Sequence, residues 1–503
     1  MIAGRTMRSA ALAAGLVTSL AGSVSGQAAG SPAAPPTCGE DLAGARRTIE
    51  ADYGGYRLEI VGRRKAAFER AYARLEREAS HAAGDCYPVL NAFADWFQDP
   101  HLFIYQTARL DSAESARRAA AVRMAPVTEE AAREYFTSRG SKLDPIEGIW
   151  YAGHLRLAVV PDPARPRGHF MAVVVQPDTA TWRAGAVRAT LARRTDGSYD
   201  VDLAGPNYVL WHRHAHLHRH VLLRLDPGVW GKAFPVATAD SGLLDPVDPR
   251  RPTLIVRAAA VVISMPSHDP AYKPALDSLV RANAELIRRS ALMLVDLRGN
   301  EGGSSYTAAA LAPYIMSRDR RPSPVVHHHA VMLSSPDQIA YAKVAFGPDT
   351  MPFVRSLVSR MEASPGEFVR LDTASTEEDD TSIPAVYGPV RVGILVDRGT
   401  VSAAEVAVEF ALRSTRATVF GEPTAGALDY EQVRIVPLHP NEKRWLLGYP
   451  TITRDVSLPK GGIRGKGLRP DVPVKWQSVA DPIGYVIRAL AKCQRARPGS
   501  CSG

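Results

Sequence analysis

The 503-residue sequence predicts an α/β protein that begins with helices and carries a β-rich stretch in its middle. From residue 38 to about residue 140, apolar residues recur at helical spacing on a charged background. Between about residues 145 and 226, short β-branched and aromatic runs alternate with turn sequences. From residue 252 onward, buried-strand patterns alternate with amphipathic-helix patterns, which is typical of βα units around a mainly parallel sheet.

The first residues have the pattern of a secretory signal. Arg5 and Arg8 precede the apolar run 10–21, and small residues continue to Gly26. We therefore expect residues 1–26 to be a signal peptide and the chain to be exported, to the periplasm or as a secreted protein. No later apolar run reaches about 18 residues without a charge, so we expect no stable membrane insertion.

Composition is that of a globular protein with a large core, at 46% hydrophobic and 22% charged residues. The formal charge of +9 is spread along the chain. We interpret it as surface character, with an anionic partner as the alternative, and predict no nucleic-acid binding. The oligomeric state is left open by the sequence.

Four cysteines lie near the two ends of the mature chain. An even number of cysteines in an exported protein favours disulfides. We expect the pairs Cys38–Cys86 and Cys493–Cys501, because each closes a loop within one local segment; the second pair belongs to a tail, residues 493–503. Four free thiols are the alternative. Metal binding by these cysteines is not favoured, because no CxxC spacing is present.

The N-terminal helical region, residues 38–140, contains a sharp corner. The helical pattern of Tyr87–Phe97 ends at Asp99-Pro100-His101, because the residue before a proline is pushed out of the α region. His101 therefore sits on a corner after a helix. Taken alone, such a histidine is usually structural or simply exposed.

Residues 145–250 form the β-rich module, for which we predict a small antiparallel barrel or sandwich. Ligand or partner recognition and a purely structural role are equally open. Alternating histidines in this module would share one face of a strand, unless a turn near Leu217 interrupts them, and a second histidine cluster follows later. No metal site is predicted, because HExxH spacing and interleaved carboxylates are missing. These histidines are His212, His214, His216, His218, His220, His327, His328 and His329.

In the third region, residues 252–492, a glycine-rich turn follows the buried strand Leu292–Leu297. This turn, Arg298–Ser304, precedes a predicted helix from Tyr306 to about Met316, so its backbone N–H groups are exposed to a ligand. A phosphate-binding loop lacks support, because the lysine and Ser/Thr of a P-loop are absent, as is GxGxxG. An oxyanion hole fits the turn better.

A second strand–turn–helix unit presents Ser402. Val392–Val396 is a short buried strand, Asp397–Thr400 is a polar turn, and a helical pattern runs from Ser402 to about Leu412. A serine hydroxyl there lies among free N–H groups at the positive end of a helix. The alternative interpretation is that Ser402 only caps the helix.

Four ordered motifs within about Pro252–Trp476 resemble the catalytic domain of the C-terminal-processing (tail-specific) serine peptidases and the tricorn protease core. The resemblance implies a ClpP/crotonase-like core with Ser402 as nucleophile, a peptide or protein substrate and no cofactor. The motifs are Leu294–Ser304 (LVDLRGNEGGS), Gly393–Glu405 (GILVDRGTVSAAE), Gly421–Gly426 (GEPTAG) and Gly467–Val472 (GLRPDV).

The resemblance also implies a general base. One branch of the family uses a lysine where this chain has Ala427, so a Ser–Lys mechanism of that kind is excluded. The tricorn-like branch uses a histidine from the N-terminal region, and His101 lies in the matching segment. Its imidazole would activate the serine hydroxyl. The oxyanion donors would be the N–H of Ala403 and one from Gly302 or Gly303.

Two departures from the family pattern matter. Arg464 stands where the tricorn-like pattern has the glutamate that orients the base, so we look to Asp429 first and Glu431 second as substitutes, with a structural use of either left open. No PDZ-like insert is evident; the β-rich module resembles the Gly-Ile-Trp-containing module of some bacterial members. We expect an exported serine peptidase. The alternatives are a non-catalytic peptide-binding protein on this scaffold and a serine hydrolase that acts on esters.

Overall fold

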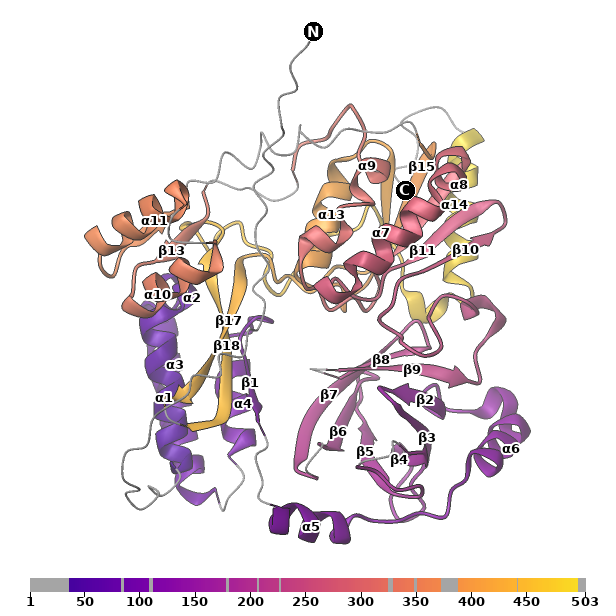
Figure 1. Ribbon diagram of the computed structural model, residues 1–503, viewed down its shortest axis with the longest axis horizontal. Helices are drawn as coiled ribbons and strands as arrows, with labels where there is room; N and C mark the ends of the chain where they lie inside the picture. Colours follow the sequence, from indigo (N-terminus) through magenta and orange to yellow (C-terminus); the bar gives the residue numbers. More distant parts are fainter. Residues whose placement is uncertain are drawn as a thin grey trace.

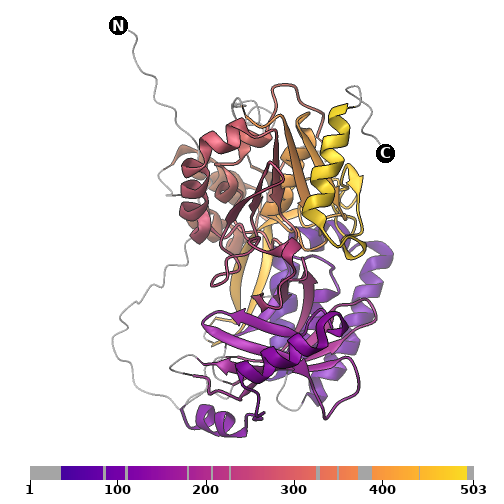
Figure 2. The same ribbon diagram turned by 90° about the vertical axis from the view of Figure 1, so that its right-hand side faces the viewer.

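The computed structural model describes residues 36–495 except 83–85, 108–111, 178–180, 206–207, 226–227, 324–328, 348–350, 372–387 and 441. The predicted signal peptide, His327 and His328, and Cys501 therefore lie outside the described residues. Within the described ranges, no helix has both the length and the apolar character needed to cross a bilayer. Figures 1 and 2 show a helical part, a β-barrel and an α/β core.

In the helical part, helices from the start of the chain pack on strands from near its end (Figure 1). The sheet order is β1-β18-β13-β14, and β17 pairs with β18. Leu42 and Phe93 from the helices share one core with Leu447 and Tyr449 from β18. The elements are α1 (Cys38–Asp52), α2 (Gly54–Glu59), α3 (Gly62–His81), α4 (Tyr87–Asp95), β1 (Phe103–Gln106), β13 (Val331–Leu333), β14 (Phe368–Arg370), β17 (Tyr430–His439) and β18 (Glu442–Thr453). Two further helices, α10 (Pro336–Ala345) and α11 (Pro352–Ala363), cover the β13–β14 end of this sheet.

A disulfide joins Cys38 at the start of α1 to Cys86 just before α4. This confirms the predicted pairing, which closes a loop with a sequence separation of 48 residues. The partner predicted for Cys493 lies outside the described residues, as does the side chain of Cys493 itself.

The β-rich module is a closed antiparallel barrel, so the prediction of a small barrel or sandwich is confirmed as a barrel. Large side chains such as Trp150, Leu157 and Tyr199 fill its core. Strand β7 continues through Leu217, so no turn interrupts the histidine alternation there, and the turn comes at Arg219 and His220. The strands are β2 (Gly148–Ala152), β3 (Leu155–Pro161), β4 (His169–Gln176), β5 (Val187–Arg193), β6 (Tyr199–Ala204), β7 (Leu210–His218), β8 (Leu222–Leu225) and β9 (Val229–Phe234); α5 (Ser112–Ala121), α6 (Glu129–Arg139) and the 3₁₀ turn η1 (Gly140–Lys142) precede them.

The α/β core is built on a six-stranded sheet in the order β10-β11-β12-β15-β16-β19. All neighbouring pairs from β11 to β19 are parallel, and β10 is antiparallel to β11. The strands are β10 (Thr253–Arg257), β11 (Ala260–Ser264), β12 (Leu292–Asp296), β15 (Arg391–Val396), β16 (Ala417–Gly421) and β19 (Val472–Pro473).

Helices cover both faces of this sheet, which explains its almost unbroken apolar strand sequences. Met293 and Val295 of β12 pack with one group of helices, whereas Leu292 and Leu294 pack with the C-terminal helix on the other face. The helices are α7 (Lys273–Ala282), α8 (Ala284–Arg289), α9 (Ala312–Ile315), α13 (Ala403–Arg413) and α14 (Pro482–Arg495); the 3₁₀ turns are η2 (Thr238–Asp240), η3 (Pro270–Tyr272), η4 (Ser305–Ala308) and η5 (Trp476–Ser478).

Two helix predictions in the core were wrong in extent. The predicted helix Ala275–Ser290 is divided into α7 and α8 at Asn283. The predicted helix from Tyr306 to Met316 is the 3₁₀ turn η4 followed by the short helix α9, because Pro313 has no N–H to continue an earlier turn. The loops after β12 and β15 are unaffected, and they meet at the carboxyl edge of the sheet, where α/β proteins place their sites.

Candidate active site

Ser402 occupies a strained position between β15 and α13. Its backbone has φ 56° and ψ −120°, which only glycine adopts readily. Its N–H donates to Glu405 Oε2 at 3.0 Å, and Glu405 is fully buried. Strain of this kind is kept where the surrounding structure fixes a functional residue. The side chain of Ser402 is half-buried at the N-terminus of the helix.

The glycine-rich turn after β12 packs directly on this serine. A Cβ atom on Gly302 would lie 2.8 Å from Ser402 Cβ and 3.3 Å from Ala403 N, so only glycine fits. The N–H of Gly302 donates to Asn300 Oδ1 at 2.9 Å. By contrast, the N–H groups of Gly303 and Ala403 donate to no other residue among those described. Of the three predicted oxyanion donors, these two remain available to a ligand.

His101 lies on the predicted corner after α4 and is only 7% exposed. Its Nδ1 contacts the carbonyl oxygen of Tyr430 at 2.6 Å. Because a carbonyl oxygen only accepts, Nδ1 carries the proton and Nε2 keeps a lone pair. The backbone N–H of His101 donates to Asp99 Oδ1 at 2.9 Å, which holds the corner. An imidazole in this tautomer can remove a proton through Nε2.

A buried charged cluster supports the residue that contacts His101. The Tyr430 hydroxyl donates to Glu59 Oε1 at 2.6 Å, and Arg464 forms an ion pair with Glu59. The Arg464 guanidinium also lies over the Tyr430 ring at 5.6 Å. Beside this cluster, Tyr53 donates to Asp99 at 2.6 Å, and burial raises the pKa of Asp99. Arg464, at the position expected for an orienting acid, therefore helps to hold Tyr430.

Asp429 and Glu431, the proposed substitutes for that acid, are both engaged elsewhere. The Asp429 carboxylate accepts the N–H groups of Ile463 at 2.9 Å and Arg464 at 3.0 Å, and so fixes the loop before Gly467. Glu431 pairs with Arg454. The group on His101 Nδ1 is the main-chain carbonyl of Tyr430, which no side-chain pattern in the sequence could reveal.

Glu405 connects the Ser402 helix to the segment that leads to Tyr430. Its carboxylate accepts the Thr424 hydroxyl at 2.6 Å and the N–H groups of Gly426 at 2.7 Å and Ala427 at 2.8 Å. Burial raises the pKa of Glu405, and these hydrogen bonds oppose that rise. Ala427, where one branch of the family has its lysine, thus contributes its backbone to this link.

Histidines on the outer face of strand β7 pair with carboxylates of the neighbouring strand. His212 and His214 alternate with inward-facing residues of β7, and they contact Asp202 and Asp200 of the neighbouring strand β6. His216 lies farther along the same face, and His220 comes after the turn. In the part of the chain that the structure describes, no three or more His, Cys, Asp or Glu side chains are grouped so as to hold a metal ion.

Sequence reasoning missed His268, which is fully buried behind the glycine turn. Its Nδ1 contacts Asn300 Oδ1 at 3.1 Å, and its Nε2 has no hydrogen-bond partner among the described residues. Its carbonyl oxygen accepts the N–H of Ser304. Burial lowers the pKa of His268 to about 4, although the contact with Asn300 opposes this. The sequence around His268 carries no motif that marks it, and its burial depends on residues far away in the chain, such as Asn300.

The low pKa of His268 predicts acid sensitivity. In the unfolded chain His268 becomes protonated below a pH near 6.5. In the folded protein it becomes protonated only near pH 4. From pH 7.5 to pH 5, this difference should lower the free energy of unfolding by about 2 kcal/mol. His268→Gln should lack this share of the pH dependence, as measured by urea unfolding at both pH values. Equal pH dependence in wild type and His268→Gln would contradict the prediction; exposed His154→Gln is the control.

Ser402 with its strained backbone, the N–H groups of Gly303 and Ala403, and His101 with its Nδ1 on a carbonyl are groups of the kinds that a serine hydrolase uses. Among the contacts of the described residues, none joins His101 to Ser402. Residues 262–474 match the sequence model of Peptidase family S41. No curated protein sequence matches the chain. The matched segment, residues 262–474, is therefore similar to serine-type peptidases.

Solved structures similar to this chain include several proteases. The photosystem II D1 C-terminal processing protease shares 13% identity at a TM-score of 0.35, and the match covers 92% of this chain and 100% of that one. Mature CPAF complexed with lactacystin shares 12% identity at a TM-score of 0.45, with 91% and 98% covered. The tricorn protease shares 11% identity at a TM-score of 0.36, with 91% of this chain and 37% of that one covered.

Proposed function

We propose that this protein is an exported serine peptidase with a ClpP/crotonase-like core, Ser402 as nucleophile and His101 as general base. The observation that carries the proposal is the strained backbone of Ser402, held against Gly302 beside the unengaged N–H groups of Gly303 and Ala403. A serine that only caps a helix needs none of these features. The Cys38–Cys86 disulfide supports export, because such bonds persist in oxidising compartments.

The reaction proceeds through an acyl-enzyme. Ser402 Oγ attacks the carbonyl carbon of the scissile peptide bond while its proton passes to His101 Nε2. The oxyanion that forms accepts hydrogen bonds from Ala403 N–H and Gly303 N–H. The imidazolium gives the proton to the leaving amine, and the C–N bond breaks. His101 then takes a proton from water while the water oxygen attacks the ester carbon. The imidazolium returns that proton to Ser402 Oγ as the C–Oγ bond breaks and the acid is released.

The Tyr430 carbonyl has the orienting role that a carboxylate has in most serine peptidases. It fixes the His101 tautomer without adding a negative charge next to the imidazole. During the reaction His101 becomes an imidazolium. At Nδ1 this positive charge is stabilised by a carbonyl dipole and not by a carboxylate. We therefore expect slower acylation than with an aspartate or glutamate at the same place.

Labelling with a fluorophosphonate probe tests the proposal. The purified mature protein, Ser402→Ala and His101→Ala are compared by intact mass. We expect one adduct on the wild type, none on Ser402→Ala, and labelling slowed by at least about 100-fold in His101→Ala. Ser335→Ala is the matched control, because Ser335 caps α10 with an ordinary backbone, φ −120°, and its removal should leave the adduct unchanged.

The labelling result also separates the alternatives. Absence of an adduct on folded wild type would overturn the peptidase and favour a peptide-binding scaffold, for which the loss of the acid at Arg464 is the supporting observation. If the protein forms an adduct and hydrolyses esters but cleaves no peptides, the roles proposed for Ser402 and His101 stand. The proposed substrate then changes from a peptide to an ester.

A further inference from the structure

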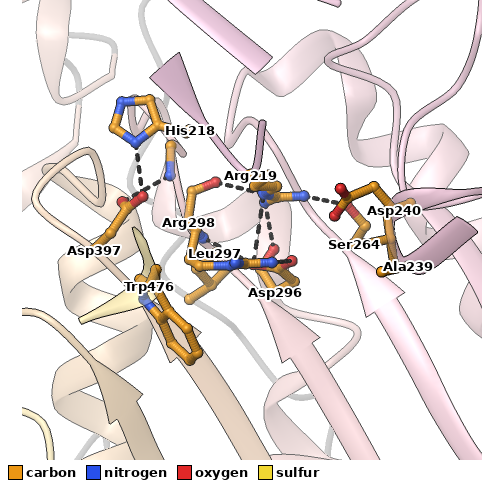
Figure 3. A network of polar contacts seen from close by, with 12 residues as sticks. His218, Arg219, Ala239, Asp240, Ser264, Asp296, Leu297, Arg298, Asp397 and Trp476 are labelled. Atoms are coloured by element: carbon orange, nitrogen blue, oxygen red, sulfur yellow. Dashed lines mark hydrogen bonds and ion pairs between the residues drawn. The ribbon is translucent and has the colours of Figure 1, made fainter. Parts of the chain in front are cut away.

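The turn between β7 and β8 reaches out of the barrel and onto the two loops that carry the candidate active site (Figure 3). One loop, residues 297–303, follows β12 and contains Gly303. The other, residues 397–402, follows β15 and ends at Ser402. At the tip of the turn, Arg219 and His220 both have positive φ, 56° and 57°, which is costly for residues with side chains. The barrel therefore holds a strained turn against the catalytic loops.

The carboxylate of Asp397 joins the barrel to both loops at once. His218 Nδ1 contacts Asp397 Oδ2 at 2.7 Å, with side chains only 10% and 9% exposed. The other oxygen, Oδ1, accepts the N–H of Gly299 at 2.8 Å and that of Gly399 at 2.9 Å. Burial alone would raise the pKa of Asp397, but His218 and the Gly299 amide lower it well below its ordinary value. The carboxylate is thus charged and has a donor on each side.

Arg219 makes a second connection, and it is buried. Its Nε donates to Arg298 O at 2.8 Å, and its Nη2 donates to Asp296 O at 2.9 Å. Nη1 donates to Ser264 Oγ at 2.5 Å. These acceptors lie at the ends of β11 and β12 and in the glycine turn (Figure 3). A buried guanidinium with this many main-chain acceptors fixes the path of the backbone that it contacts.

Close packing leaves no room for the loops to shift past the turn. A Cβ atom on Gly399 would lie 2.3 Å from His218 Cε1, and one on Gly299 would lie 2.9 Å from His218 Cβ. Both loops also bond each other, through Val401 N–H to Asn300 O at 2.9 Å. Two loops from neighbouring strands are therefore clamped by one turn of the barrel, and this turn lies more than 70 residues away from either loop in the sequence.

We propose that His218 and Arg219 are positioning residues of the active site, and that the barrel sets the catalytic rate by fixing Gly303 relative to Ser402. The inference rests on the proposed function, and it assigns the barrel the role of positioning the catalytic loops. The imidazole of His218 holds Asp397, Asp397 holds the two glycine amides, and the glycine loops place the oxyanion donors. Neither His218 nor Arg219 contacts the reacting atoms.

Three substitutions at His218 test this. In His218→Asn, the side-chain NH₂ takes the place of Nδ1–H; in His218→Gln, it reaches the place of Nε2; and His218→Leu has no donor. We expect kcat for a peptide to fall about 10- to 100-fold in His218→Leu with KM within about 2-fold, because the loops place the oxyanion donor. His218→Asn should recover most of the lost rate, and His218→Gln should recover less.

His214→Leu is the matched control. His214 lies on the same face of the same strand and contacts Asp200 through Nδ1 at 2.8 Å, but both side chains are about half exposed and away from the loops. Its substitution should leave kcat unchanged. An unchanged kcat in His218→Leu, or a parallel rise in KM, would overturn the proposal. If His218→Leu does not fold, equal activity of His218→Asn and His218→Gln would overturn it.

Hydrogen exchange makes the test independent of peptidase activity. The amides of Gly299 and Gly399 are bonded to Asp397, so both loops should exchange faster in His218→Leu than in wild type or His214→Leu. Unchanged exchange in these loops would overturn the clamp even in an active enzyme. If wild type takes no fluorophosphonate label, the proposed function fails while faster exchange still establishes the clamp.

Discussion

Gly303→Ala is expected to lower kcat for peptide hydrolysis by about 100-fold or more, because the proposed oxyanion donor is displaced. Gly303 has φ 136°, and a Cβ atom there would lie 2.3 Å from His268 O and 2.7 Å from Asp269 N. Both are main-chain atoms, and His268 forms a β-bridge with Gly303, so the clash cannot be relieved by rotating a side chain. The loop must move, and its N–H moves with it. Kinetics with a fluorogenic peptide measure the loss.

Gly197→Ala separates this effect from backbone strain. Gly197 lies in a barrel turn with φ 84°, and nothing lies within 4 Å of an added Cβ atom. This control should lower the free energy of unfolding by about 1–2 kcal/mol through strain alone and leave kcat as in wild type. If Gly303→Ala folds and keeps its kcat, Gly303 is not an oxyanion donor, and the assignment of the glycine turn fails.

Glu405→Gln should lower the free energy of unfolding by about 3 kcal/mol, because an amide can replace only one of the two acceptor oxygens. The carboxylate accepts from Ser402 N–H, the Thr424 hydroxyl and two further backbone amides, and the residue is fully buried. At least one of these donors loses its partner in the variant. Glu405→Gln should also lower kcat by at least about 10-fold. The reason is that the same carboxylate links the Ser402 helix to the segment whose Tyr430 carbonyl contacts His101.

Urea unfolding and peptide kinetics on the same preparations test both effects. Glu285→Gln is the control, since its carboxylate forms ion pairs on the surface of α8 and its side chain is 54% exposed. Its substitution should change the free energy of unfolding by less than about 0.5 kcal/mol. A Glu405→Gln protein as stable and active as this control would show that the buried carboxylate does not hold the site together.

Local sequence patterns were sufficient for the parts of this protein that are built locally. The barrel follows from short alternating strands with turns between them, and the parallel sheet follows from buried runs that alternate with helices. The strand–turn–helix position of Ser402 and the corner at His101 were also predictable, because each depends on residues within a few positions. The Cys38–Cys86 disulfide followed from the loop that it closes.

The remaining parts depend on contacts between distant residues. Tyr430 acts through its carbonyl, a group that every residue has, so no residue type marked it out. Arg464 pairs with Glu59 across 405 positions, and His218 contacts Asp397 across 179. A single sequence does not show such pairings, since a charged residue usually lies at the surface. For the same reason Asp429 was a reasonable expectation, and only the structure shows its carboxylate on the amides of a loop.

The pairing of the first quarter of the chain with strands near its end has a consequence for how the protein is made. His101 meets Tyr430 across 329 residues, and β1 pairs with Trp445–Gly448 of β18. The chain is synthesised from its N-terminus, so the helices are made long before these strands. The helices can bury their apolar faces only after the strands have been made. A chain that stops before residue 430 lacks the carbonyl group that His101 Nδ1 contacts. On the proposed mechanism, catalysis therefore begins only after the chain has been synthesised beyond residue 430.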